Sequence, residues 1–173
     1  SIRILSRIFL GLVFMFSGFV KAVDPWGSAY KFQDYFAAFH MEWLDPAALV
    51  LGVLLSLAEF VIGVGLLFGT WMMFFSWAVT IFMTFFLVLT LLLAIDNPVS
   101  DCGCFGDAIK MTNWETFYKN AVLMVFTLVV FFNRTRYREP YSRPVRYLII
   151  GLGSAFLIGI SIYCYRYLPI LDF

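Results

Sequence analysis

Long uninterrupted apolar runs, separated by short polar stretches, dominate the chain. Five of these runs approach the roughly 20 residues that a helix needs to cross the hydrocarbon core of a bilayer. They occupy residues 4–23, 47–68, 71–95, 116–132 and 145–167. A transmembrane barrel would instead need segments of about 10 residues in which apolar and polar positions alternate, and these runs do not alternate. The pattern therefore predicts an all-α, polytopic membrane protein.

The composition agrees with a membrane location. Hydrophobic residues make up 62% of the 173-residue chain and aromatic residues 20%, which is more than a soluble domain carries. This length accommodates several spans with short connections, but not a sizeable soluble domain as well. The first run follows Arg3 and Arg7, as the apolar part of a signal peptide would. It is too long and ends without a small-residue cleavage site, so we expect the mature protein to retain it.

The distribution of positive charge predicts an orientation. Residues 133–146 form the most basic connection, with Glu139 as their single acidic residue. The arginines are Arg134, Arg136, Arg138, Arg143 and Arg146. Because basic connections stay in the cytoplasm, we expect this segment and the N-terminus to be cytoplasmic. The connections over 24–46 and 96–115 and the C-terminal tail would then lie outside the cytoplasm.

The first outer connection contains an amphipathic pattern over residues 28–39. Its apolar positions recur at helical spacing, with Lys31 and Asp34 elsewhere on the helix. These positions are Ala29, Phe32, Phe36 and Phe39. We expect a short helix that lies in the membrane interface or packs over the mouth of the bundle as a lid.

Two ionisable residues lie deep inside predicted spans, where charge is costly and usually has a partner. Counted from the cytoplasmic ends of their runs, Glu59 is about 13 Å deep and Arg7 about 6 Å deep, at 1.5 Å per residue. An arginine side chain can cover that difference, so we predict an ion pair between Arg7 and Glu59. The pair would fix the helix register, or it would handle protons or contact a polar head group in a cavity.

Lys21 and Lys119 lie near the predicted outer ends of their spans, at the level of the connection 96–115. One interpretation is that both side chains extend to the interface. The other is that one of them lowers the pKa of a nearby cysteine, because an ammonium group favours the reactive thiolate.

That outer connection contains the motif DCGCFGD, in which Gly103 separates Cys102 from Cys104. A disulfide between these two cysteines would close a very small ring, which Gly103 permits by allowing a bend. A strained disulfide is labile, and labile disulfides are typical of exchange chemistry. A structural pair stays an alternative. So does a zinc site completed by Cys164 and His40, although ligands one residue apart are uncommon.

Three segments resemble the DoxX-like superfamily of small membrane proteins, in particular its redox-associated branch, the MauE family. The segments are RIFLGLVFMFSGFVKAVDPWG, AEFVIGVGLLFG and DCGCFGDAIKMTNWETFYKNAVLM. The resemblance spans residues 4–132 and implies a four-helix bundle, a bacterial inner-membrane location and a role in electron or thiol chemistry. By position it selects Arg7, Ser17, Lys21 and Glu59 in the helices, and Cys102 with Cys104 as the redox pair.

The expected organisation has three parts. Residues 1–132 would form the four-helix DoxX-like bundle, residues 133–146 the basic cytoplasmic loop, and residues 147–173 the fifth transmembrane helix with an extracytoplasmic tail. The sequence contains no nucleotide-binding glycine loop, hydrolase triad or nucleic-acid-binding surface.

These features favour a membrane thiol–disulfide or electron-transfer protein. Its Cys102–Cys104 pair would exchange electrons with an extracytoplasmic thiol, on a separate protein or a soluble domain. Because the first four spans contain no cysteine, a cytoplasmic thiol donor is disfavoured and a lipid-soluble quinone is the expected second partner. Its head group would lie near Lys21, Glu59 or Trp114, with Lys119 at the same level.

Cys164 would act as a relay thiol if the fifth helix packs near the motif. The competing interpretation is a non-catalytic membrane scaffold or assembly subunit, surrounded by lipid within a larger envelope complex.

Overall fold

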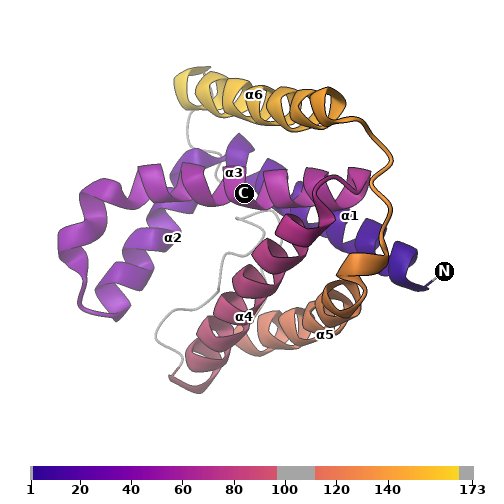
Figure 1. The fold of residues 1–173 in the computed structure, drawn as a ribbon. Helices are drawn as coiled ribbons and strands as arrows, with labels where there is room; N and C mark the ends of the chain where they lie inside the picture. Colours follow the sequence, from indigo (N-terminus) through magenta and orange to yellow (C-terminus); the bar gives the residue numbers. More distant parts are fainter. Residues whose placement is uncertain (1, 97–111, 168–173) are drawn as a thin grey trace.

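The computed structural model describes residues 2–96 and 112–167, and the regular structure in these two ranges is helical throughout (Figure 1). The elements are α1 Ile2–Val23, α2 Pro25–Ala38, η1 Glu42–Ala47, α3 Ala48–Phe68, α4 Met72–Asp96, α5 Asn113–Phe132, η2 Arg134–Arg136 and α6 Arg143–Tyr167. Within this part, five helical stretches are long and apolar enough to cross a membrane, centred on α1, α3, α4, α5 and α6. The predicted all-α, multi-pass fold is confirmed. The largest shift of a boundary is at α5, which begins at Asn113 rather than at residue 116.

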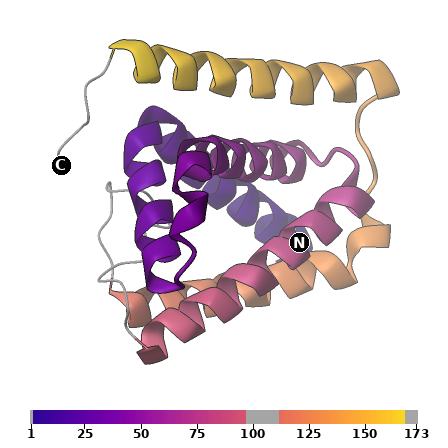
Figure 2. The same ribbon diagram turned by 90° about the vertical axis from the view of Figure 1, so that its left-hand side faces the viewer.

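The helices are arranged in three layers. Helices α1 and α3 lie in the middle, α4 and α5 on one side and α6 on the other (Figures 1 and 2). The two faces of α3 account for this order, because Ile62 and Leu66 pack in the core shared with α4 and α5. Phe60 and Val64 pack instead with Leu157 of α6. The middle pair is thus the frame on which the other membrane helices are built.

Glycines allow α1 and α3 to pack with their backbones in contact. A Cβ atom added at Gly18 would lie 2.6 Å from the backbone nitrogen of Phe60 and 2.6 Å from the carbonyl oxygen of Ser56. One added at Gly11 would lie 2.8 Å from the backbone nitrogen of Leu67. Small residues that let membrane helices approach closely also fix their register. Here the register is antiparallel, because the later residue of α1 faces the earlier residue of α3.

A tight turn separates α3 from α4. Gly69 ends α3 in the left-handed conformation, with φ of 68°, and the Thr70 N–H donates to the carbonyl oxygen of Gly65 at 3.0 Å. Glycine adopts this conformation without the steric cost that a Cβ atom brings. From this turn α4 diverges from α3, which leaves the two helices separated toward the end of α4 (Figure 1).

The predicted amphipathic helix is present as α2. The carboxylate of Asp24 accepts a hydrogen bond from the Gly27 N–H at 2.9 Å, and Pro25 occupies the first turn, where its missing N–H costs nothing. Ala29 and Phe36 are buried in a small core that α2 shares with the start of α3. Packing of α2 on the bundle is therefore established, while its contact with the membrane interface stays a prediction.

The facing ends of α4 and α5 are held together. Thr112 and Glu115 form a reciprocal capping box at the start of α5. The side-chain amide of Asn113 donates to the carbonyl oxygen of Leu93 in α4 at 3.2 Å. The described chain on both sides of 97–111 is therefore fixed at this end of the bundle. Cys102 and Cys104 lie outside the described residues.

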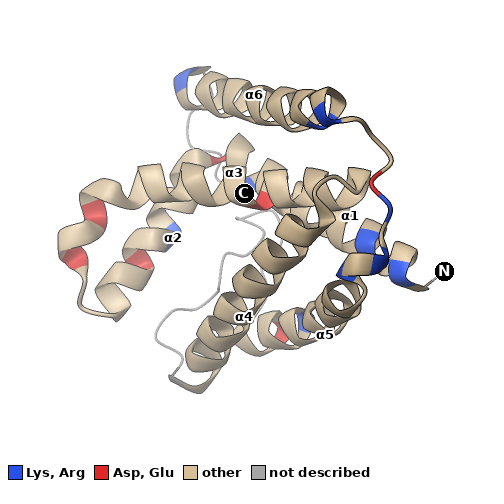
Figure 3. Cartoon of the chain, in the orientation of Figure 1, with Lys and Arg blue, Asp and Glu red and all other residues tan. Residues whose placement is uncertain are grey.

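Basic residues gather at the opposite end, around the N-terminus, η2 and the start of α6 (Figure 3). The Arg134 guanidinium lies 4.1 Å from the centroid of the Phe131 ring, and Arg146 pairs with Glu139. The arginines predicted to mark the cytoplasmic side thus surround one end of the molecule. The orientation itself stays a prediction.

Candidate functional site

Three polar side chains from α1 and α3 meet inside the bundle. The ammonium nitrogen of Lys21 lies 2.8 Å from Oε2 of Glu59 and donates to the hydroxyl of Ser17 at 2.8 Å. The Ser17 hydroxyl in turn donates to Glu59 Oε2 at 2.8 Å. All three residues are buried, with at most 8% of their surface exposed. We refer to Ser17, Lys21 and Glu59 as the Lys21 cluster.

The sequence produces this cluster through spacing and packing. Ser17 and Lys21 are four residues apart, so they lie on one face of α1. Gly18 brings that face against the backbone of α3 at Phe60, next to Glu59. A lone charge at this depth would be strongly unfavourable, whereas an ion pair with an added hydrogen-bond partner satisfies both charges.

The predicted ion pair between Arg7 and Glu59 is wrong. The Arg7 guanidinium lies beside Gly69, at the end of α3, and 5.7 Å from the centroid of the Tyr137 ring. Glu59 is ten residues before Gly69, which is about 15 Å along the helix axis. The antiparallel register places Lys21, not Arg7, opposite Glu59. Arg7 therefore does not belong to the candidate site.

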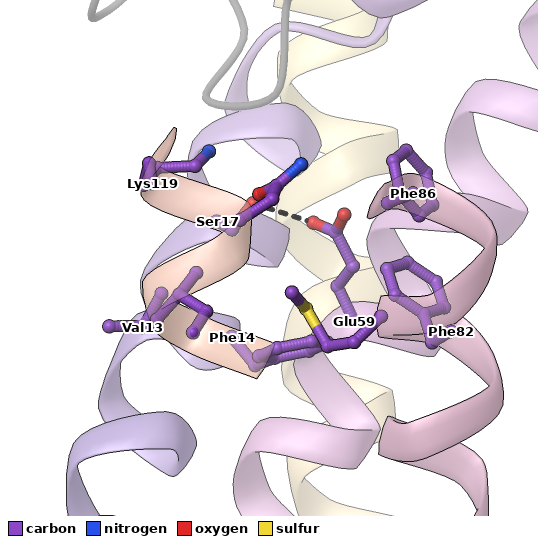
Figure 4. A pocket seen from close by; sticks show the side chains of 10 residues that line it. Val13, Phe14, Ser17, Glu59, Phe82, Phe86 and Lys119 are labelled. Carbon is purple, nitrogen blue, oxygen red and sulfur yellow. Dashed lines mark hydrogen bonds between the residues drawn. The ribbon is translucent and has the colours of Figure 1, made fainter. Parts of the chain in front are cut away.

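A small cavity adjoins the cluster. It has a volume of about 40 Å³ and lies between the Ser17 and Glu59 side chains and helices α4 and α5. From α5 it is lined by Lys119 and Asn120, and Figure 4 shows the Glu59 carboxylate between Ser17 and two phenylalanines of α4. This volume admits a few water molecules at most. The cavity places a carboxylate, a hydroxyl, an amide and an ammonium group around a space of water size.

A much larger groove lies between α2, α3 and α4, where α4 diverges from α3. Its volume is about 720 Å³, within the usual range for a bound small molecule. Lys21 contributes to its lining, together with Ser28, Lys31 and Tyr35 of α2, and the remaining lining residues are apolar. The Lys21 cluster therefore lies between two spaces. Lys21 lines the apolar groove, whereas Ser17 and Glu59 line the water-sized cavity.

Sequence reasoning missed Asn120, Phe82 and Phe86 as site residues. Asn120 is 4% exposed, and its side-chain amide donates to the hydroxyl of Thr90 at 3.3 Å. The signal for Asn120 was present, because an amide inside an apolar run marks a partner or a cavity. No comparable signal exists for the two phenylalanines, which are two of 21 in the chain.

Two predicted site residues lie elsewhere. Trp114 is 48% exposed and packs against Phe117 and Tyr118 of its own helix, and it is not among the residues that line the cavity or the groove. Cys164 is a buried free thiol of α6, in the layer on the far side of α1 and α3 from α4 and α5. The structure thus brings Ser17, Lys21, Glu59 and Lys119 together, without Trp114 and Cys164.

The alternative zinc site receives no ligand cluster from the described residues. Within 2–96 and 112–167, no group of three or more histidine, cysteine, aspartate or glutamate side chains is arranged to hold a metal ion. His40 is exposed at the end of α2 and Cys164 is buried in α6. The other two ligands of that alternative, Cys102 and Cys104, lie in the segment that the structure does not describe.

Comparison with protein families identifies one match. The family model described as "Methylamine utilisation protein MauE" matches residues 1–133. The match ends next to the predicted boundary of the bundle at residue 132, so α6 lies beyond it. Searches of the curated proteins and of the solved structures gave no match.

Proposed function

Because the chain belongs to the MauE family, a DoxX-like family of membrane proteins, we propose that it transfers electrons between an extracytoplasmic protein thiol and a membrane quinone. Cys102 and Cys104 would carry the thiol chemistry, and the Lys21 cluster would receive the quinone head group. The observation that carries this proposal is the position of the buried cluster, between a water-sized cavity and a large apolar groove.

The residues present fit a quinone. Lys21 is buried and belongs to the lining of the groove, so its ammonium group, which bonds Ser17 and Glu59, would lie next to a carbonyl oxygen bound there, an acceptor that an ammonium group suits. The surrounding groove is apolar, as a lipid-soluble molecule requires. A bound quinone would accept two electrons and two protons and so become a quinol.

The two thiols determine how many electrons and protons the proposed reaction transfers. In the oxidising direction, the disulfide of Cys102 and Cys104 exchanges with a partner dithiol, which leaves a disulfide in the partner and two thiols here. Reoxidation of these two thiols releases two electrons and two protons. Glu59, which lines the water-sized cavity, and Lys21, which pairs with it, would hold or pass those protons. The reverse sequence would reduce a partner disulfide at the expense of quinol.

The ends of the cysteine segment support this coupling. Asn113 begins α5 and is tied to Leu93 of α4. Lys119, which lines the small cavity, is six residues farther along α5, or about 9 Å along its axis. The described chain that follows the cysteine segment therefore reaches the lining of the cavity within the first two turns of α5.

Alkylation trapping in native membranes tests the proposal. In a Cys164→Ser background the two remaining thiols report only the proposed pair. We expect Cys102 and Cys104 to be mostly oxidised when quinone is present and to accumulate as thiols when quinone is depleted. A single redox state under both conditions would sink the proposal and favour the competing function, a membrane scaffold that tolerates loss of both cysteines.

The same background examines the relay role predicted for Cys164. Because Cys164 is buried in α6, away from the cavity, we expect the Cys164→Ser variant to keep the exchange rate of the native chain. A loss of exchange in this variant, together with a trapped mixed disulfide to Cys102 or Cys104, would return Cys164 to the pathway.

A further inference from the structure

Two phenylalanines of α4 form a wall between the small cavity and the groove. Phe82 and Phe86 are four residues apart, and their rings stack with centroids 4.7 Å apart and planes 24° from parallel. Among the described residues, these two line both the small cavity and the groove. Figure 4 shows them beside the Glu59 carboxylate. The groove therefore meets the Lys21 cluster at Lys21, and this aromatic pair separates the groove from the cavity that Ser17 and Glu59 line.

The groove divides into a polar and an apolar side. The polar members of its lining belong to α1 and α2, whereas α3 and α4 contribute apolar side chains alone. Leu54 of α3 and Ile81 of α4 are 55% and 63% exposed, so the apolar side is open at the surface of the protein. In a membrane that surface faces lipid. The groove thus connects the hydrocarbon phase with the buried cluster.

We infer that this groove holds the isoprenoid chain of the quinone, and that Phe82 and Phe86 position its ring beside Lys21. This inference rests on the proposed function and specifies where the substrate lies. A flat ring packs favourably on aromatic faces, and a groove whose α3 and α4 side is lined by leucine, phenylalanine and other apolar side chains suits a hydrocarbon tail.

Charge and size favour a quinone over a phospholipid at the inner end. Where the groove meets the cluster, Glu59 neutralises Lys21, which suits a neutral carbonyl group better than a phosphate, and the second lysine of the lining, Lys31, belongs to α2. The space behind the aromatic wall, about 40 Å³, admits water but no lipid head group. The ring would stay on the groove side of Phe82 and Phe86, with water on the other side next to Glu59.

Photoaffinity labelling of the purified full chain in nanodiscs tests this placement. The probes are an azido-ubiquinone with its isoprenoid chain and the same azido-benzoquinone ring without the chain. Ile81→Trp fills the groove with a bulky side chain and leaves the cluster intact. Val88→Trp is the matched control, because Val88 is an exposed residue of α4 that is not among the residues lining the groove.

We expect Ile81→Trp to lower labelling by the long-chain probe at least about tenfold and to change labelling by the chainless probe less than about twofold. Val88→Trp should change neither. Replacing both Phe82 and Phe86 by leucine should lower labelling by both probes, by about three- to tenfold. Leu54→Trp, which narrows the groove from α3, provides a second variant if Ile81→Trp does not fold.

Three results would overturn the inference in distinguishable ways. If both probes label the native chain, but the groove variants act like Val88→Trp, the quinone binds elsewhere: electron transfer between thiol and quinone survives, whereas the groove and the Lys21 cluster lose their role in binding. If neither probe labels the native chain above the level of a denatured control, quinone binding fails altogether. Competition by phospholipid but not by unlabelled ubiquinone would assign the groove to lipid.

Discussion

Helix α1 carries two basic side chains toward α3, and their surroundings differ. Arg7 lies beside the Gly69 turn and over the Tyr137 ring, where the Tyr137 hydroxyl also donates to the carbonyl oxygen of Arg3 at 2.8 Å. Lys21 instead pairs with a buried carboxylate and lines a groove. At the Arg7 end, α1 contacts the Gly69 turn and the connection that contains Tyr137, and so holds both against the bundle. The Lys21 end combines the same tight helix packing with a groove and a small cavity, which the surroundings of Arg7 do not share in the pockets described above.

The largest effect on stability is expected when one partner of the Lys21–Glu59 ion pair is removed and the other stays buried. Glu59→Leu leaves Lys21 buried without its carboxylate and should lower the free energy of unfolding by about 3–5 kcal/mol. The double variant Lys21→Met/Glu59→Leu removes both charges and should recover most of that stability. Thermal unfolding in detergent measures both changes.

The same double variant decides what the pair is for. If it serves the redox reaction, the restored protein should still fail to reoxidise Cys102 and Cys104 in membranes. A stable double variant with native exchange rates would show that the pair only fixes the register of α1 and α3.

Alanine substitutions at two glycines of the α1–α3 contact should have an intermediate effect on stability, and they compare the two ends of α1 directly. Gly11→Ala and Gly18→Ala each push a Cβ atom into the backbone of α3, and each should lower stability by about 1–3 kcal/mol. Gly18 lies at the Lys21 end, so only its variant should also reduce quinone labelling and thiol exchange. Equal functional loss in both variants would mean that general loosening of the helix pair, rather than displacement of the cluster, causes the defect.

The smallest effect is expected at the Arg7 end. Tyr137→Phe removes the hydrogen bond to Arg3 and should cost about 0.5–1.5 kcal/mol, with no effect on thiol exchange. Burial raises the pKa of Tyr137 above its ordinary value of 10.0, and Arg7 and Arg3 oppose this shift only partly.

The sign of the pH dependence follows from that shift. The folded state holds the phenol proton more tightly than the unfolded state, so the contribution of Tyr137 to stability is complete below about pH 10 and is lost as the pH rises through the raised pKa. Unfolding curves of the native chain should therefore show a loss of stability above pH 10 that Tyr137→Phe reduces. Identical alkaline profiles for the two proteins would contradict this assignment.

The apolar runs were sufficient to predict the membrane helices, because a span of hydrocarbon imposes their length directly. The family was also predictable, from motifs in the first two membrane helices and the cysteine segment, and the family match confirms it. The α2 helix followed from its spacing, although its start at Pro25 depends on the cap that Asp24 supplies.

The partner of Glu59 was not predictable from depth alone. Counting residues along two separate runs measures position along each helix, but not which faces meet or how closely the axes approach. Gly18 determines both, because its missing side chain lets α1 approach α3 beside Glu59. The wall of Phe82 and Phe86 was hidden for a different reason. Sequence spacing does not tell which phenylalanines of an aromatic-rich helix face an internal space.

The bond from Asn113 to Leu93 and the bond from Asn120 to Thr90 join α4 and α5 through side chains and backbone outside the cysteine segment. The two helices therefore keep their junction whatever chain connects residue 96 to residue 112. Lengthening a connection costs little, about 0.6 kcal/mol for each doubling of its length. The helices of the bundle therefore form a fixed scaffold, and the connection between residues 96 and 112 can be exchanged without changing it. A connection with a different cysteine spacing could therefore be grafted between α4 and α5 without rebuilding the helices.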